Sequence, residues 1–231
     1  MKTIGLIGGT TWISTLDYYR IINRTVNKKL DGSHSARCIL YSVDFDEDVV
    51  QHNGKWNEIS KIFIDIAKKL EQSGADFIVI CANTMHIIAD DIQKNIDVPI
   101  LHIVDVTAEK IVDKGLKKVG LLGTKYTMEE EFYIKRFKDK YNIDLIVPEP
   151  EERKFVHDVI INELANEKIL KSSKEKYIEI INSLASKGAE GIILGCTEIP
   201  LLIKKDDCGI QIFDTTTIHA KAAANFALKQ D

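Results

Sequence analysis

Cys196 is the side chain in this 231-residue sequence that is best placed for acid/base chemistry. It follows an apolar run at residues 192–194 and precedes Thr197 and Glu198. A thiol near the free N–H groups that begin a helix has a lowered pKa, so it can act as a base or a nucleophile. A buried structural role is the commoner fate of a single cysteine, so the position needs support from elsewhere in the chain.

A duplication within the chain gives that support. Two stretches of the first half are similar to two of the second, residues 4–10 to 119–124 and residues 74–80 to 188–194. Gly74 corresponds to Gly188, so the offset is about half of the chain, far longer than the ~20–50-residue periods of solenoids. Counting onward makes Ala82 the counterpart of Cys196. The two halves therefore differ at the residue that matters most for acid/base chemistry.

Cys81 stands one residue before this counterpart position. Neighbouring side chains of a strand point to opposite faces, so the thiol points away from the site if the strand continues through Cys81. If the backbone has already turned, the thiol still reaches the site. Both alternatives stay open, and the candidate catalytic residues are Cys196 and Cys81.

Small or hydroxyl-bearing residues follow four of the predicted strands, at residues 8–11, 82–84, 123–124 and 196–198. Ligands of open α/β sheets bind at such strand ends, where N–H groups and hydroxyls can hold a carboxylate, an amino group or a phosphate. A tight turn explains each one alone, but four in symmetric positions favour a binding site. The candidate substrate-binding residues are Thr10, Gln51, Ala82, Asn83, Thr84, Thr124, Thr197 and Glu198.

The elements that must position these residues follow from an alternation of short apolar runs and amphipathic segments. The predicted strands are residues 3–7, 38–43, 77–80, 100–103, 119–122, 145–147, 192–194 and 210–213. The charged residues between 149 and 154 predict a solvated loop. Alternating strands and helices indicate parallel sheets with helices on both faces. With the duplication, this predicts an α/β protein of two pseudo-symmetric parallel-sheet domains and an active-site cleft between them.

The domain boundaries are predicted from the repeat, since no linker is visible. Asp105 and Asp214 each follow a predicted strand and resemble N-caps, whose short polar side chains accept from free backbone N–H groups. We assign residues 1–98 and 214–231 to the first domain and residues 99–213 to the second. The last helix is then expected to pack on the first domain.

Composition and charge exclude several classes of function. The net charge is −4 with both signs mixed, which favours neither nucleic acid nor an anionic membrane as a partner. No apolar run approaches the ~18 residues of a membrane span, and no signal peptide is visible, so a cytoplasmic location is expected. The four cysteines and the scattered histidines lack metal-ligand spacing, so no bound metal is expected.

Three motifs give the chain a resemblance to a known family. Residues 4–19, which include Gly8, Gly9, Thr10 and Thr11, resemble the amino-terminal signature of the aspartate/glutamate racemases. Residues 83–86 and 195–200 resemble the two catalytic loops of that family. The similarity extends over nearly the whole chain, and it is greatest to the broad-specificity amino-acid racemases and their aspartate- and glutamate-acting relatives.

The resemblance implies a homodimer that uses neither pyridoxal phosphate nor a metal. In the family, one cysteine thiolate removes the α-proton of an amino acid and a second thiol delivers a proton from the opposite face. By position, the resemblance makes Cys196 the acid/base of the second domain. The resemblance also implies that the carboxylate and amino group of the substrate are bound by Asn83, Thr84, Thr124 and Thr197. It implies that Thr10 and Gln51 line the pocket.

Two departures from the family pattern define the alternatives. The family has a cysteine where this chain has Ala82, which predicts one-sided chemistry unless Cys81 or a water serves the other face. Relatives that act on acidic substrates often carry a lysine where we align Phe155, so no preference for aspartate or glutamate is predicted. We predict a cofactor-independent amino-acid racemase. The alternatives are a single-thiol decarboxylase of malonate-type acids and a non-catalytic binder of carboxylic acids.

Overall fold

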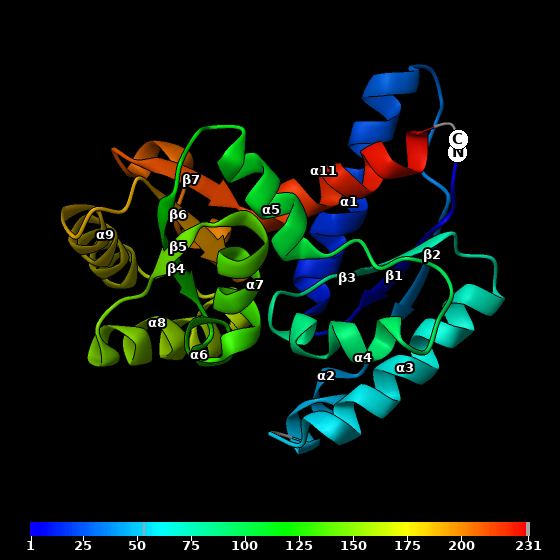
Figure 1. Ribbon diagram of the computed structural model, residues 1–231, viewed down its shortest axis with the longest axis horizontal. Helices are drawn as coiled ribbons and strands as arrows, with labels where there is room; N and C mark the ends of the chain where they lie inside the picture. The colour runs from blue at the N-terminus through cyan, green and yellow to red at the C-terminus, as the bar shows by residue number, and fades with distance from the viewer. Residues whose placement is uncertain (53, 230–231) are drawn as a thin grey trace. The chain divides into compact units, whose positions relative to one another are not determined.

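The computed structural model describes residues 1–52 and 54–229, which form two compact units (Figure 1). Unit 1 contains residues 1–103 and the segment from His219 onward, and unit 2 contains residues 104–218. The sequence placed the corresponding boundaries at 98/99 and 213/214. Each unit is built on its own parallel sheet.

The sheet of unit 1 has three parallel strands in the order β2-β1-β3. They are β1 (Ile4–Gly8), β2 (Cys38–Ser42) and β3 (Phe77–Ile80). Ile4 pairs with Cys38 on one side and with Phe77 on the other. Strand β1 is buried throughout, as expected for the central strand of a parallel sheet that is covered on both faces.

Helices cover both faces of this sheet. On one face, α1 (Trp12–Leu30) and α11 (Thr215–Leu228) pack against side chains such as Leu6 and Val79. On the other face, α3 (Trp56–Gln72) packs against Ile7 and Ile80. Helix α11 contributes Ala220, Ala223, Ala224 and Ala227 to the core of unit 1. The last helix of the chain therefore packs on the first sheet.

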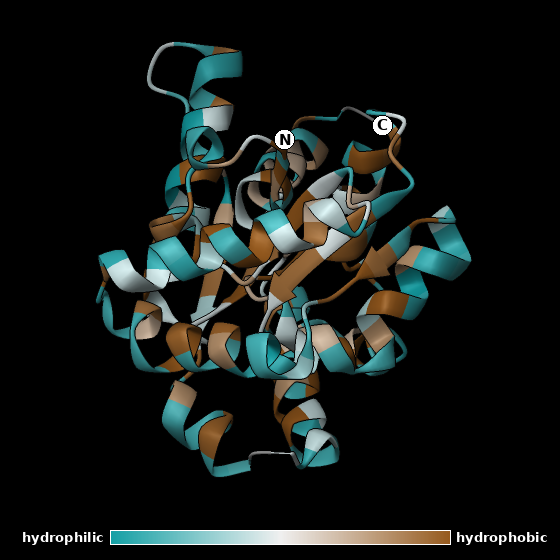
Figure 2. Cartoon of the chain, turned by 90° about the vertical axis from the view of Figure 1, so that its left-hand side faces the viewer, coloured by the Kyte–Doolittle hydropathy of each residue, from teal (hydrophilic) through white to brown (hydrophobic). Residues whose placement is uncertain are grey.

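Unit 2 has a four-stranded parallel sheet in the order β5-β4-β6-β7. Its strands are β4 (Lys118–Gly123), β5 (Asp144–Ile146), β6 (Gly191–Gly195) and β7 (Gln211–Asp214). Its longer helices are α5 (Ile103–Val112), α7 (Glu131–Tyr141), α8 (Pro150–Asn162) and α9 (Lys171–Ser186). Figure 2 shows apolar strands and helices that alternate between polar and apolar residues, the pattern of helices with one face on a core.

Short helices complete the strand-to-helix connections. In unit 1 they are α2 (Phe45–Asp48), η1 (Val50–His52), η2 (Thr84–Ile88) and α4 (Ala89–Gln93). In unit 2 they are α6 (Lys125–Glu129), η3 (Leu164–Asn166), α10 (Ile199–Leu202) and η4 (Lys205–Asp207). Three of them, η2, α6 and α10, are the first helices after strand ends at which candidate site residues lie.

The turn after β1 can be made only by glycine. Gly9 has φ +90°, and a Cβ atom built on it would lie 2.2 Å from the carbonyl oxygen of Val43. Thr15 also packs against this turn, because its hydroxyl oxygen accepts a hydrogen bond from the N–H of Gly9 at 2.9 Å. This close approach of backbone to backbone fixes the position of the next residue, Thr10.

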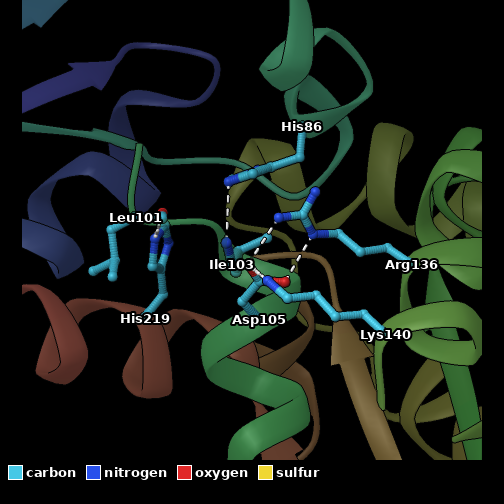
Figure 3. A network of polar contacts seen from close by, with 7 residues as sticks. All are labelled: His86, Leu101, Ile103, Asp105, Arg136, Lys140 and His219. Carbon is cyan, nitrogen blue, oxygen red and sulfur yellow. Dashed lines mark hydrogen bonds and ion pairs between the residues drawn. The ribbon is translucent and has the colours of Figure 1, made fainter. Parts of the chain in front are cut away.

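Three sequence predictions of local structure are wrong. Residues 100–103 form no full strand: Ile100 makes a single bridge to Ile78, and α5 already begins at Ile103. Asp105 therefore lies in the first turn of α5 and is not its N-cap. There it pairs with Arg136 and Lys140, with N–O distances of 2.7 Å to each (Figure 3). The third error is the charged run that begins at Glu149.

That charged run, read as a solvated loop, is the start of α8. Pro150 occupies the first turn, where its missing N–H costs nothing. Glu149 and Glu152 form a capping box, in which each side chain bonds to the backbone N–H of the other. The predicted cap at Asp214 agrees with the structure, since its carboxylate accepts from the N–H of Thr217 at 3.1 Å.

Two general features concern binding partners. Among the helices of residues 1–52 and 54–229, none is long and apolar enough to cross a membrane. Within the same described residues, no group of three His, Cys, Asp or Glu side chains is arranged to hold a metal ion.

Candidate active site

In each unit, the parallel register brings the ends of two strands to one edge of the sheet. In unit 1, Ile7 of β1 pairs with Ile80 of β3, so the segments that follow both strands leave the sheet together. In unit 2, Gly123 of β4 pairs with Gly195 of β6. Thr124 and Cys196 each follow one member of that pair. The predicted site residues of unit 2 are thus adjacent because of strand register.

Cys196 and Glu198 form a buried hydrogen-bonded pair at the end of β6. The thiol donates to Oε2 of Glu198 at 2.9 Å, and the hydroxyl of Thr197 donates to the same oxygen at 2.8 Å. The exposed fractions are 8% for Cys196, 7% for Thr197 and 3% for Glu198. Hydrogen bonds to a carboxylate are stronger than those between neutral groups. A carboxylate directly bonded to the thiol is positioned to take its proton.

The surroundings of Cys196 hold its thiol in the protonated form. Burial raises the pKa of the thiol well above its usual value, and the Glu198 carboxylate raises it further through its charge and its hydrogen bond. The backbone N–H groups of Thr197 and Glu198 lower the pKa, as the sequence predicted, but by less. The predicted net lowering of the pKa is therefore wrong, because burial and the neighbouring carboxylate together outweigh the helix start.

Thr124 shapes the adjacent strand end. Its side chain caps α6, accepting from the N–H of Thr127 at 3.4 Å. A Cβ atom on Gly123 would lie 2.9 Å from the carbonyl oxygen of Gly195, so β4 and β6 approach too closely for a side chain there.

Cys81 lies in the apolar core of unit 1. Its N–H donates to the carbonyl of Ile7 at 2.9 Å, so the backbone is still in the strand ladder at this residue. Its side chain is fully buried in the same cluster as Leu6, Tyr18 and Val79. Burial raises the pKa of this thiol far above its usual value. The structure supports the first alternative, in which Cys81 points away from the strand-end residues, and it argues against the predicted catalytic role.

The three residues after Cys81 form a compact turn into η2. The side chain of Ala82 is partly buried against the opposite core cluster, and Asn83 is buried with 3% exposure. Thr84 begins η2. His86 bonds to this turn through Nδ1, 2.7 Å from the carbonyl oxygen of Ala82. Sequence reasoning did not give His86 a role, although it ends the motif of residues 83–86.

The two remaining predicted residues of unit 1 have different surroundings. Thr10 directly follows the turn at Gly9 and is buried with 6% exposure. Gln51 lies in η1 and its side chain is exposed, donating to Oδ2 of Asp46 at 3.0 Å. The pocket-lining role predicted for both residues stays a prediction.

Comparison with known proteins identifies the family. The family model for Asp/Glu/hydantoin racemases matches residues 7–223. The chain belongs to the Asp/Glu/hydantoin racemase family. It is 28% identical to the broad specificity amino-acid racemase RacX of Bacillus subtilis over 176 residues, 73% of this chain and 72% of that protein. Membership of this racemase family supports amino-acid racemase activity.

Solved structures of related chains share the whole fold. One from Yersinia pestis, provisionally named an Asp/Glu racemase, is 46% identical with a TM-score of 0.93, covering 99% of this chain and all of that one. An aspartate racemase homologue from Pyrococcus horikoshii is 41% identical with a TM-score of 0.87, and the match again covers 99% of this chain and all of that one. Two parallel-sheet α/β domains are thus the architecture of this racemase-family chain, as the sequence predicted.

Proposed function

We propose that this chain is a cofactor-independent amino-acid racemase in which Cys196 exchanges the α-proton and Glu198 accepts the thiol proton. The observation that carries the proposal is the 2.9 Å bond from the Cys196 thiol to the buried Glu198 carboxylate. A protonated thiol cannot remove a proton. Because the pKa of Cys196 is raised, the thiol needs an adjacent acceptor, and Glu198 supplies it.

The proposed reaction begins with a proton transfer within the pair Cys196 and Glu198. The thiol proton passes to Glu198, and the resulting thiolate removes the α-proton of the amino acid. The electron pair of the C–H bond stays on the α-carbon as a carbanion. Return of a proton from Cys196 restores the same enantiomer. Inversion needs a proton from the other face of the carbon, and because Ala82 has no titratable group, we propose that a water molecule delivers it. The hydroxide formed then takes the proton that Glu198 accepted, which restores water and the carboxylate.

Thr197 and Thr124 support the binding of the substrate. The hydroxyl of Thr197 uses its proton in the bond to Glu198, so its oxygen can still accept from a substrate ammonium group. Thr124 presents a hydroxyl at the start of α6, where backbone N–H groups favour a carboxylate. Together with Asn83 and Thr84, they are the proposed ligands of the carboxylate and amino groups. Thr10 and Gln51 are proposed to line the pocket. The predicted cleft that would combine them stays a prediction.

The range of side chains accepted is proposed to be broad. Phe155, which we align with the lysine of acid-specific relatives, packs against Tyr177 with ring centroids 6.2 Å apart. Its neighbour Lys154 is ion-paired with Asp158. Neither residue offers an unpaired cation to a substrate carboxylate. We therefore expect neutral amino acids to be accepted alongside aspartate and glutamate.

The deciding experiment is an NMR screen for α-deuterium incorporation from heavy water, using both enantiomers of each amino acid. Exchange in the wild-type protein that disappears in Cys196→Ala supports the proposal. Exchange that persists in Cys196→Ala contradicts it. Release of carbon dioxide from a disubstituted malonate, without any α-proton exchange, assigns the chain to decarboxylases instead. Ligand-induced thermal stabilisation without either reaction indicates a binder.

Two further predictions accompany this function. The family resemblance predicts a homodimer, which sedimentation velocity tests directly. A cytoplasmic location also stays a prediction. Neither affects the proton transfer proposed for Cys196 and Glu198.

A further inference from the structure

His86 is a buried residue of unit 1 that the proposed proton transfer does not use. It lies in η2 with 3% exposure, two residues after Thr84. Its Nδ1 atom is 2.7 Å from the carbonyl oxygen of Ala82, and the N–H of Ile103 donates to its Nε2 atom at 3.2 Å. Figure 3 shows the ring lying above Ile103. One imidazole thus joins two segments that are far apart in the sequence.

The partners of the ring define its tautomer. A carbonyl oxygen can only accept, so Nδ1 carries the hydrogen that Ala82 receives. A backbone N–H can only donate, so Nε2 carries a lone pair. His86 is therefore neutral in this arrangement, with its proton on Nδ1. An imidazolium would lose the bond to Ile103, because neither of its nitrogens can accept.

Ile103 is the first residue of α5 and the last residue of the first of the two segments that form unit 1. The first N–H groups of a helix have no acceptor within that helix. His86 provides the acceptor for one of them, the N–H of Ile103. The neighbouring Leu101 is also held, since its N–H donates to Ile78 at 2.9 Å and its carbonyl accepts from Nε2 of His219 at 2.7 Å. The segment of residues 101–103 is therefore fixed by two histidines.

His219 resembles His86 in being buried and neutral. Its Nε2 donates to Leu101, so its Nδ1 accepts from the hydroxyl of Tyr18 at 2.8 Å. Burial lowers the pKa of His219 to about 4. The two imidazole rings lie with centroids 5.7 Å apart. His86 differs in one respect: its second bond reaches the turn that contains proposed substrate ligands.

We propose that His86 is a positioning residue that holds the turn of residues 82–84 in register with the start of α5. The inference rests on the proposed function for its effect on catalysis, but its structural part stands alone. Asn83 and Thr84 can bind a substrate only if their backbone is fixed, and the bond from His86 to the carbonyl of Ala82 fixes the start of this turn. Each bond of the ring then has a separate consequence.

Two substitutions separate the two bonds. In His86→Asn, the side-chain N–H₂ lies where Nδ1 was, so the bond to Ala82 is kept and the bond to Ile103 is lost. In His86→Gln, the longer amide reaches the position of Nε2, so Ile103 keeps an acceptor and Ala82 loses its donor. His34→Gln, at an exposed position, is the matched control.

Amide hydrogen exchange followed by NMR is the first measurement. We expect the amide of Ile103 to exchange about tenfold faster in His86→Asn, since a hydrogen bond contributes on the order of 1 kcal/mol. The amides of Asn83 and Thr84 should do the same in His86→Gln. General destabilisation would accelerate both groups in both variants. The crossed pattern is therefore specific to the proposed positioning.

Steady-state kinetics is the second measurement, with the amino acid that the wild-type protein exchanges fastest. We expect His86→Gln to raise KM about tenfold and to lower kcat by less than about threefold, while His86→Asn and His34→Gln leave KM within about threefold. Equal KM values in both His86 variants, or an uncrossed exchange pattern, overturn the inference. If the wild-type protein exchanges no α-proton, the proposed function fails, and the amide measurement still decides the role of His86.

Discussion

Cys81 and Cys196 are both buried thiols at the carboxyl end of a parallel strand, yet their surroundings differ completely. Cys81 is enclosed by aliphatic and aromatic side chains, and its thiol donates a long hydrogen bond to the carbonyl of Val79, at 3.9 Å. Cys196 bonds to a carboxylate at 2.9 Å. Burial raises the pKa of both thiols. Only Cys196 has a neighbour that can take its proton.

Depth of burial alone therefore does not decide whether a cysteine can take part in proton transfer. A one-residue difference in register turns Cys81 toward the helices α1 and α11, whereas Cys196 is followed at once by Thr197 and Glu198. The chemistry depends on a polar neighbour at the point where the strand ends. Four substitutions test this comparison.

The largest effect is expected from Cys196→Ala. Removing the only group proposed to touch the α-proton should lower the rate of α-deuterium incorporation by about 10³-fold, within the range of general acid–base catalysis. NMR in heavy water measures it. Cys208→Ala, at a half-buried cysteine without a proposed role, is the matched control. A rate in Cys196→Ala equal to that of the control would place the chemistry elsewhere.

Glu198→Gln should change two properties of Cys196 in opposite directions. Loss of the carboxylate removes a cause of the raised pKa, so more thiolate forms at pH 8 and alkylation by iodoacetamide becomes faster. Loss of the proton acceptor should slow α-proton exchange by about 10²-fold. Mass spectrometry of alkylated peptides and NMR measure the two rates.

The pH dependence follows from the same carboxylate. Because the wild-type pKa of Cys196 is raised, alkylation should increase with pH beyond the usual range of a thiol, and the profile of Glu198→Gln should shift to lower pH. If exchange and alkylation both become faster in Glu198→Gln, the thiolate alone is the base and Glu198 only suppresses it.

Ala82→Cys should convert the one-sided site into a two-sided one. A thiol at the counterpart of Cys196 can deliver a proton to the other face of the α-carbon, so inversion of configuration should increase about tenfold relative to α-proton exchange. Circular dichroism follows inversion, and NMR follows exchange in the same sample. Ala82→Ser, which adds a hydroxyl of similar size but much higher pKa, is the control. An unchanged ratio would contradict the alignment of Ala82 with Cys196.

Cys81→Ala should have the smallest effect on activity. Because the thiol lies in the core and points away from the strand-end residues, exchange should stay within about twofold of the wild type, while loss of the packed sulfur lowers the free energy of unfolding by about 1 kcal/mol. Urea denaturation measures the second quantity. A large loss of activity without loss of stability would restore Cys81 as a catalytic candidate.

Much of the fold could be predicted because the relevant signals are local. Apolar periodicity located seven of the named strands, and the cap at Asp214 was visible as a polar residue between a strand and a helix. The failures have physical causes as well. Residues 100–103 look like a strand, but only Ile100 pairs with the sheet before α5 begins. The charged run after Glu149 looks solvated because a capping box and a loop have similar compositions.

The sequence by itself determined the family, the duplicated α/β architecture and the position of Cys196, because motifs and periodicity are properties of neighbouring residues. The tertiary structure decided what each thiol faces. Strand register set Cys81 into the core, and burial together with Glu198 raised the pKa of Cys196 where a helix start alone predicted the opposite. It also assigned partners to both nitrogens of His86. These outcomes depend on distances between segments remote in sequence, which only the folded chain brings together.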